Sequence, residues 1–402
     1  MATCRRPSNQ YHGLMRRPFA GLTRSTAYLA LASFFADVST ELLYPILPVF
    51  LTQTLHASGS VVGLVEGVAE ATQNIVQGFS GWLSDTLRRR KPIALLGYVV
   101  AATAKPLMGV STTWPGVLGA RFMDRLGTGI RSAPRDALVA ASVQETNRGK
   151  AFGLEGLGDN MGAFVGPLLA VFLLASLQLE LRVIFYLATI PGMLAACMVA
   201  LVTERRVTVA AKSTLDVNIR RFPAPYWKYL LAMAVFGVGN SSNSFLILHT
   251  KDIGASLPAT IVIYAVFNLV AALISYPAGS WSDRLGRRNV LAVSFVIFLL
   301  TYLGFGLTRN VVTIAGCFIL YGLYQGIARS VGKALATDLV PSTLRASGLG
   351  WYSATTGLLG LVASVVAGQL WDHVSHAAVF FYGAAFAAAG TIALIALVPA
   401  DT

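Results

Sequence analysis

Charged residues are scarce in this sequence. Asp, Glu, Lys and Arg make up only 12% of its 402 residues, whereas 55% of the residues are hydrophobic and the mean hydropathy is +0.64. So few charges cannot cover the surface of a soluble protein of this length. The composition therefore excludes an ordinary soluble enzyme and predicts a protein that is surrounded by lipid.

The usual patterns of cofactor and metal sites are also missing. The three cysteines, Cys4, Cys197 and Cys317, are scattered, so neither a disulfide framework nor a thiolate metal site is expected. The five histidines are not spaced as metal ligands, and the sequence has no Gly-x-x-x-x-Gly-Lys phosphate loop. We therefore expect no enzyme activity, no bound metal and no cofactor.

Acidic residues are the minority among the charges, with 18 Asp and Glu against 31 Lys and Arg and a net charge of +13. The basic residues form short clusters between apolar stretches instead of one basic face, so a nucleic-acid partner is not expected. Lys and Arg of membrane proteins concentrate in short cytoplasmic loops. Their placement predicts a multi-pass protein of the inner membrane with both termini cytoplasmic.

Long apolar stretches account for most of the chain, and a helix needs ~20 such residues to cross a bilayer. We count twelve, near residues 27–53, 60–83, 93–111, 114–138, 151–176, 182–203, 228–250, 258–281, 290–308, 312–338, 347–371 and 376–398. The sequence thus predicts an all-α integral membrane protein with twelve transmembrane helices in two pseudo-symmetric halves. The predicted divisions are a cytoplasmic tail (1–24), a six-helix half (25–203), a cytoplasmic linker (204–227) and a second six-helix half (228–402).

A short motif occurs once in each predicted half. Residues 81–90 and 279–288 both contain Gly, Ser and Asp followed by a cluster of arginines, and both lie between two apolar stretches. Other positions repeat as well, since Gly129-Ile130 corresponds to Gly326-Ile327. Two repeated halves are expected of a transporter that works by rocking one half against the other.

With this motif at two equivalent turns of a twelve-helix chain, the sequence resembles the major facilitator superfamily over nearly its whole length. The first copy departs from the family pattern, because Arg88 stands where Gly is usual, whereas the second copy keeps Gly286. The resemblance implies that the motif closes the cytoplasmic side in the outward-facing state. The alternative is that its arginines only set the orientation in the membrane.

The two aspartates of the motif are expected to begin cytoplasmic loops, each leading into the N-terminus of the next helix. The residues assigned to this cytoplasmic gate are Gly81, Asp85, Arg89, Arg90, Gly279, Asp283, Arg287 and Arg288.

The fifth apolar stretch contains a glycine face. Gly158, Gly162 and Gly166 recur every four residues, so a second helix can approach closely, and Pro167 is expected to bend the helix. The pattern resembles the Gly-x-x-x-Gly-Pro antiporter motif of exporters in this superfamily, which points to the drug/proton antiporter-like efflux branch. Packing of small residues without directional meaning is the alternative.

Ionisable residues within apolar stretches are concentrated in the first half. A charge at the bilayer centre costs at least ~2.5–3.5 kcal/mol, so such groups face a cavity, form pairs or bind protons. Corresponding positions in the second half are neutral, as with Tyr321 in place of Asp124. The residues that we predict to couple transport to protons are Asp37, Glu41, Arg121, Asp124, Arg125 and Asp159.

Arg121 matches the arginine of the family's helix 4 motif, and the resemblance implies a role for it in proton relay or in holding the first helix. The alternative for the whole set of ionisable residues is fixed interhelical ion pairs, above all Glu155 with Arg131 or Arg135. The acidic pair Glu66 and Glu70 is compatible with either a transport role or an outer vestibule wetted by water.

Polar and aromatic residues in the middle of several stretches are candidates for the wall of a central cavity. Those predicted to bind substrate are Glu70, Asn240, Asn243, Tyr264, Asn268, Tyr321, Gln325 and Trp351. Hydrogen bonds between helices without a ligand are the alternative. Carboxylates facing amides and aromatic rings predict an amphipathic or cationic organic substrate.

The sequence as a whole favours a carrier that exports a small organic compound in exchange for protons, with the proton gradient as the driving force. The first alternative is an exporter of divalent metal ions that uses Asp37, Glu41, Glu70 and Asp159 as oxygen ligands. The second is a membrane sensor or lipid-moving protein with the same fold.

Overall fold

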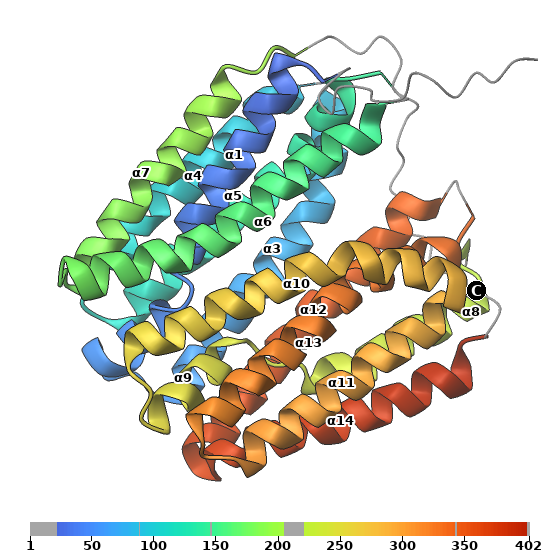
Figure 1. Ribbon diagram of the computed structural model, residues 1–402. Helices are drawn as coiled ribbons and strands as arrows, with labels where there is room; N and C mark the ends of the chain where they lie inside the picture. The colour runs from blue at the N-terminus through green and yellow to red at the C-terminus, as the bar shows by residue number, and fades with distance from the viewer. Residues whose placement is uncertain (1–21, 88, 145–146, 205–220, 342–343, 400–402) are drawn as a thin grey trace, which may run out of the picture.

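The computed structural model describes residues 22–87, 89–144, 147–204, 221–341 and 344–399. All secondary structure in these residues is helical (Figure 1). The first half contains α1 (Arg24–Glu41), α2 (Leu47–Val49), η1 (Phe50–Thr54), α3 (Gly59–Leu87), α4 (Arg90–Val110), α5 (Trp114–Ala141), α6 (Arg148–Val171), η3 (Phe172–Ser176) and α7 (Leu181–Ala200). The second half contains α8 (Ala224–Gly239), α9 (Ser244–Asp252), α10 (Leu257–Leu285), α11 (Arg287–Leu307), α12 (Val311–Asp338), α13 (Arg345–His373) and α14 (His376–Leu397).

The described helices form twelve membrane spans, which confirms the predicted fold class. Three spans are composite: the first consists of α1, α2 and η1, the fifth of α6 and η3, and the seventh of α8 and α9. Nine of the spans in the described residues are apolar enough to cross a membrane by length and composition alone. The other three contain α1, α3 and α5, which carry most of the ionisable residues discussed above. The span boundaries lie within a few residues of the predicted ones.

Local sequence explains where several helices begin and end. The side chain of Thr23 accepts a hydrogen bond from the backbone N–H of Thr26 at the start of α1, and Ser256 caps α10 in the same way. The seventh span is interrupted between α8 and α9, where the sequence contains consecutive amide and hydroxyl residues. The backbone N–H of Ser242 in this break donates to the hydroxyl of Ser364 on α13, so this N–H, which no helix satisfies, has a partner within the protein.

The repeated motif lies differently from the prediction. Asp85 and Asp283 do not begin loops, because α3 continues to Leu87 and α10 to Leu285. Neither copy has a proline before this point, and the single glycine that opens each copy is tolerated within the helix. In the second copy the C-cap residue after α10 is Gly286, whose φ of +85° is a left-handed conformation that favours glycine. The side chain of Asp85 lies outside the described residues.

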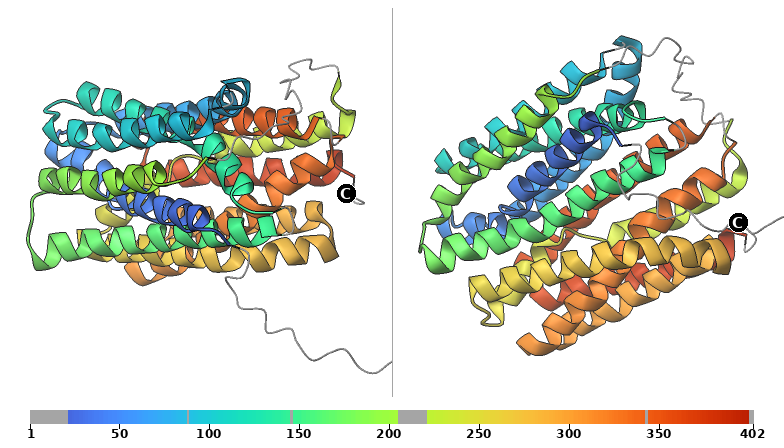
Figure 2. Two further views of the ribbon diagram at one scale, coloured as in Figure 1. Left: turned by 90° about the horizontal axis from the view of Figure 1, so that it is seen from above. Right: turned by 45° about the horizontal axis from the view of Figure 1, so that its top comes forward.

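The two halves form two bundles that lie side by side (Figures 1 and 2). Within the first half α1 packs on α6 and α7, and α4 packs on α5. The second half has the equivalent contacts of α8 with α13 and α14 and of α11 with α12. The halves meet mainly where α3 runs along α13 and where α6 crosses α10. The candidate site is therefore built at an interface between two separately packed bundles.

The contacts between halves are concentrated toward one end of the molecule. We call the end with the turns after α3 and α10 the arginine-rich end, and the other the opposite end. Near the opposite end a Cβ on Gly63 would collide with the carbonyl oxygen of Ser364, and one on Gly59 would lie 2.5 Å from the Trp371 ring. Nearer the arginine-rich end, a Cβ on Gly153 or Gly350 would meet no heavy atom within 4 Å. The halves are thus tightly packed at the opposite end and loosely packed toward the arginine-rich end.

Candidate functional site

The predicted glycine face of α6 packs directly on α1. A Cβ on Gly162 would lie 2.5 Å from the carbonyl oxygen of Phe34 and 2.8 Å from the Cβ of Asp37. A Cβ on Gly166 would lie 3.0 Å from the Cβ of Glu41. Gly158 continues this contact toward the arginine-rich end, where it packs on α1 as well. The glycines therefore bring the α6 backbone against the stretch of α1 that carries the two predicted proton-binding acids.

Glu41 lies between the two halves and is bonded to the second half. Its carboxylate accepts a 3.0 Å hydrogen bond from the hydroxyl of Tyr264 and a 3.3 Å hydrogen bond from the amide of Asn268, both on α10. Asn268 also donates to the carbonyl oxygen of Ala163 on α6, at 3.2 Å. The ring of Tyr264 stacks on that of Tyr44, with centroids 5.4 Å apart. One predicted proton-coupling residue and two predicted substrate residues therefore form a single contact between the halves.

Asp159 and Glu155 on α6 are held by one arginine of α5. Arg135 Nη1 lies 3.0 Å from Glu155 and 3.5 Å from Asp159, and it donates to the hydroxyl of Ser33 on α1. For Glu155 this is the fixed pair that the sequence offered as an alternative. Asp37, one helical turn before Glu41, is half-buried beside this group. The involvement of Asp159 and Asp37 in proton coupling stays a prediction.

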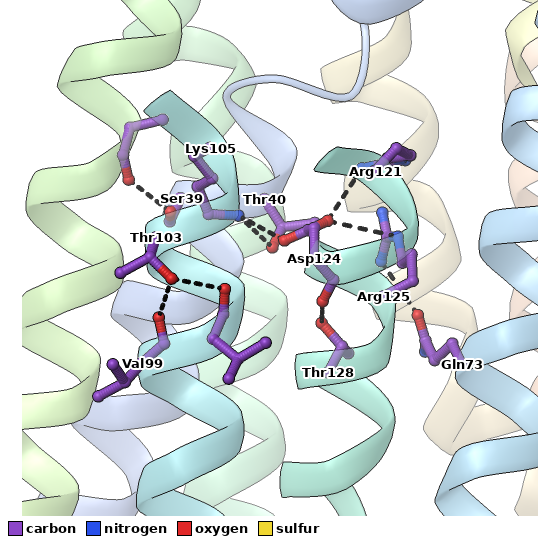
Figure 3. A network of polar contacts seen from close by, with 12 residues as sticks. Ser39, Thr40, Gln73, Val99, Thr103, Lys105, Arg121, Asp124, Arg125 and Thr128 are labelled. Carbon is purple, nitrogen blue, oxygen red and sulfur yellow. Dashed lines mark hydrogen bonds and ion pairs between the residues drawn. The ribbon is translucent and has the colours of Figure 1, made fainter. Parts of the chain in front are cut away.

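A second cluster of charges is buried inside the first half. Arg121 donates to Glu66 through two nitrogens, at 3.1 and 3.0 Å, and to Asp124 at 3.2 Å. Asp124 also contacts the amine of Lys105 at 3.1 Å and the guanidinium of Arg125 at 3.7 Å (Figure 3). Lys105, Arg121 and Asp124 are at most 2% exposed. Sequence reasoning predicted the α5 members and missed Lys105, which stands alone in an otherwise apolar stretch of α4.

The geometry explains how these charges are tolerated away from water. A buried ion pair is stable only if further hydrogen bonds satisfy both partners, and a two-point contact between arginine and a carboxylate does this well. Glu66 receives such a contact from Arg121, and Asp124 is surrounded by three cations. The cluster ties α3, α4 and α5 together within one half.

Arg125 connects this cluster to the interface between the halves. Its Nη1 donates to the Gln73 side chain on α3 at 3.0 Å (Figure 3). Glu70, one turn before Gln73, is exposed, and its carboxylate oxygen would lie 3.5 Å from a Cβ on Gly360 of α13. In the described residues no side chain forms a hydrogen bond or ion pair with the carboxylate of Glu70. A carboxylate at the contact between α3 and α13 is therefore available to a ligand.

The remaining predicted substrate residues form two groups. Asn240 and Asn243, in the break between α8 and α9, hydrogen-bond to tyrosines of α12: Asn240 donates to Tyr324 at 3.2 Å, and Tyr321 donates to Asn243 at 2.8 Å. Gln325 follows these tyrosines on α12 and is partly exposed. Trp351 lies apart from them, near the arginine-rich end, where its ring contacts that of Trp227 with centroids 6.1 Å apart.

Two basic residues of α12 were also missed. Arg329 and Lys333 are exposed within this span, and Arg329 interacts electrostatically with Glu41 and Glu70 of the other half. Arg329 was missed because it corresponds to an uncharged serine of the first half, whereas the prediction rested on the positions that correspond to charged residues of the first half. The second half thus contributes cations to the interface.

The predicted gate residues contact their own halves in the structure. Arg287 pairs with Asp338 at 2.7 Å and with Asp283 at 3.4 Å, and Arg288 donates to the carbonyl oxygen of Val398. In the first half the backbone N–H of Arg90 donates to Glu204 at 2.9 Å, and Arg89 is exposed. Gly279 has open space where a Cβ would sit, and Gly81 is described only by its helical backbone. That these residues close the cytoplasmic side in the outward-facing state stays a prediction.

Comparisons with known sequences agree with this architecture. The sequence model of the Major Facilitator Superfamily matches residues 29–248 and 229–402. The chain is 32% identical over 372 residues to MJ1317, an uncharacterised MFS-type transporter of Methanocaldococcus jannaschii, with 91% of this chain and 93% of the relative covered. It is also 22% identical over 350 residues to the multidrug resistance protein MdtH of Salmonella newport, which covers 86% of each chain.

Solved structures share the fold at low sequence identity. The nucleoside transporter NupG superposes with a TM-score of 0.76 at 15% identity, covering 93% of this chain and 99% of NupG. A D-xylose-proton symporter superposes with a TM-score of 0.75 at 15% identity, covering 94% of this chain and 98% of the symporter. These similarities concern the arrangement of the helices and leave the substrate open.

Proposed function

Because the chain belongs to the major facilitator superfamily, whose members are membrane transporters, we propose that it is a proton-coupled exporter of a small amphipathic or cationic organic compound. It would work by alternating access as an antiporter. On this proposal it resides in the inner membrane with the arginine-rich end in the cytoplasm, as the distribution of Lys and Arg favours.

The position of Glu41 is the observation that carries this proposal. Its carboxylate accepts hydrogen bonds from Tyr264 and Asn268 of the second half, so it belongs to a contact that must rearrange when the halves rock. A carboxylate that gains a proton loses its charge and part of its capacity to accept hydrogen bonds. Proton binding at Glu41 would therefore change the energy of the contact between halves, which is the physical requirement for coupling.

The chemistry of the interface supports the substrate class. Glu70 offers a carboxylate without a side-chain partner in the described residues, and the aromatic rings of Tyr44 and Tyr264 stack at the contact between the halves. Carboxylates attract cations, and the faces of aromatic rings favour both cations and apolar groups. The relation to a protein named for multidrug resistance points in the same direction.

The alternatives have less support. In the described residues no group of three or more His, Cys, Asp and Glu side chains is arranged to hold a metal ion. The four acids of the metal hypothesis have separate environments. Glu41 is bonded to α10 and Asp159 is paired with Arg135. Asp37 is half-buried and Glu70 is exposed. Membership of a superfamily of transporters favours transport over the sensor or lipid-moving alternative.

Reconstituted liposomes with an acidic lumen test the proposal. An antiporter moves its substrate toward the acidic side as protons leave, so the full-length protein should accumulate external ethidium, a cationic amphipathic probe. Pyranine in the lumen should report the matching loss of protons. Uridine, D-xylose and Mn²⁺ serve as comparison solutes, and protein-free liposomes serve as the control.

Each other outcome rejects the proposal. When the gradient is reversed so that the lumen is alkaline, accumulation of uridine or xylose together with entering protons indicates a symporter. Gradient-driven accumulation of Mn²⁺ supports the metal alternative. No movement of any of these solutes supports the sensor or lipid-moving alternative.

A further inference from the structure

Lys105 is the one member of the buried charge cluster that the sequence analysis did not discuss, and its surroundings are unusual for a lysine. Its amine lies 3.1 Å from Asp124 and donates a 3.4 Å hydrogen bond to Thr40 of α1. The charged groups that face it are Asp124, Arg121 and Arg125, all on α5. A small pocket beside it adds one more cation, Arg131, and uncharged residues of α1, α4 and α7.

The members of the cluster differ in their ability to release a proton. Arginine side chains do not deprotonate in proteins, so Arg121 and Arg125 stay charged. Protonation of Glu66 or Asp124 would deprive the buried Arg121 of a charged partner, which is strongly unfavourable. Lys105 is the remaining member, and a neutral amine can still donate a hydrogen bond to Asp124.

The charge balance of the cluster also favours Lys105 as the residue that releases a proton. With every member ionised, three cations (Lys105, Arg121 and Arg125) face two carboxylates (Glu66 and Asp124). When Lys105 releases its proton, two arginines balance two carboxylates. Titration of Lys105 therefore moves the cluster between one positive charge and none, whereas protonation of a carboxylate would add to the excess of positive charge.

Arg125 links the charge of the cluster to the carboxylates at the interface between the halves. It contacts Asp124 at 3.7 Å and Gln73 at 3.0 Å, and it interacts electrostatically with Glu41 and Glu70. A cluster with an extra positive charge weakens the attraction of these carboxylates for a cationic substrate. A neutral Lys105 strengthens it. Binding of the cation and binding of the proton would then oppose each other, which is the condition for antiport.

We infer that Lys105 is a proton-binding residue of the transport cycle, and that binding of a cationic substrate releases its proton. The ammonium gives the proton to water, and the nitrogen keeps the electron pair. This inference rests on the proposed function and names a residue for it in addition to Glu41.

Lys105→Arg is the decisive variant, because arginine keeps the positive charge but cannot release it. Two measurements are made in liposomes containing full-length protein. The first is ethidium accumulation driven by an acidic lumen, and the second is exchange of external for internal ethidium at equal pH. We expect Lys105→Arg to lose gradient-driven accumulation, down to the level of protein-free liposomes, and to retain exchange. Lys251→Arg, the same change near the opposite end, should retain both.

A second, neutral variant is used if the first does not fold. If Lys105→Arg does not elute as a monodisperse protein in detergent, Lys105→Met decides, and it should likewise exchange ethidium without gradient-driven accumulation. Gradient-driven accumulation in either folded variant overturns the inference, and so does loss of exchange along with accumulation. A wild-type protein without gradient-driven accumulation contradicts the proposed function and the inference together.

Discussion

The backbone N–H of Gly59, at the start of α3, donates a 2.8 Å hydrogen bond to the carboxylate of Asp372 near the end of α13. The next residue, Ser60, donates to the second carboxylate oxygen at the same distance. The first turn of a helix has unpaired N–H groups and a partial positive charge, and both are satisfied by an acidic side chain. Here that side chain comes from the other half, so this contact closes the opposite end.

The Gly59–Asp372 contact should stabilise the arrangement in which the opposite end is closed. Asp372→Asn keeps the size of the side chain and removes its charge, so it should weaken closure by about 0.3–1 kcal/mol. Distances between spin labels at positions 178 and 309, one on each half at the opposite end, should then show a larger population of long distances. The labelled protein needs its native cysteines replaced.

Asp252→Asn is the matched control, because Asp252 pairs with His376 of its own half at 3.0 Å. It should leave the distance distribution unchanged. Identical distributions for wild type and Asp372→Asn would contradict the role assigned to Asp372.

The glycine face of α6 should tolerate no side chain at its centre. In Gly162→Ala the new methyl group would lie 2.5 Å from the carbonyl oxygen of Phe34, which is too close without movement of a helix. Overpacking of this kind costs about 1–3 kcal/mol. Gly156→Ala on the same helix would meet no heavy atom within 4 Å and serves as the control. Unfolding by SDS should show a loss of stability for Gly162→Ala alone, and equal stability of the two variants would contradict the packing described.

Removal of one member of the buried cluster should be more damaging than removal of a charge at the arginine-rich end. Arg121→Met leaves Glu66 and Asp124 buried with fewer partners and should destabilise the protein by about 3–5 kcal/mol. Arg287→Met removes a partly exposed pair with Asp338 and should cost about 0–1 kcal/mol. The same unfolding measurement compares them, and a similar small effect for both would show that the cluster contributes little to stability.

The sequence predicts the fold well because its signals are local. An apolar stretch of bilayer length and a cluster of arginines each depend only on neighbouring residues. The glycine face of α6 was predicted for the same reason, since a spacing of four defines one side of a helix. Its partner was not predicted, because nothing in the sequence near Gly162 indicates that Asp37 packs against it.

The missed residues depend on contacts between distant parts of the chain. The role proposed for Lys105 depends on its contact with Asp124 on the next helix. The role of Asp372 depends on its contact with Gly59, which is 313 residues away. A lysine near the end of an apolar stretch and an aspartate at a helix end are both common at membrane surfaces. Only the packing of the helices distinguishes these two from ordinary surface charges.

The central claim is that Glu41 couples proton movement to rearrangement of the halves. Ethidium accumulation in liposomes with an acidic lumen, compared between wild type, Glu41→Gln and the exposed control Glu180→Gln, tests it most directly. Glutamine keeps the shape of Glu41 and cannot exchange a proton, so we expect Glu41→Gln to lose gradient-driven accumulation while still exchanging ethidium at equal pH. Glu180→Gln should behave as wild type. Undiminished gradient-driven accumulation in Glu41→Gln would contradict the account.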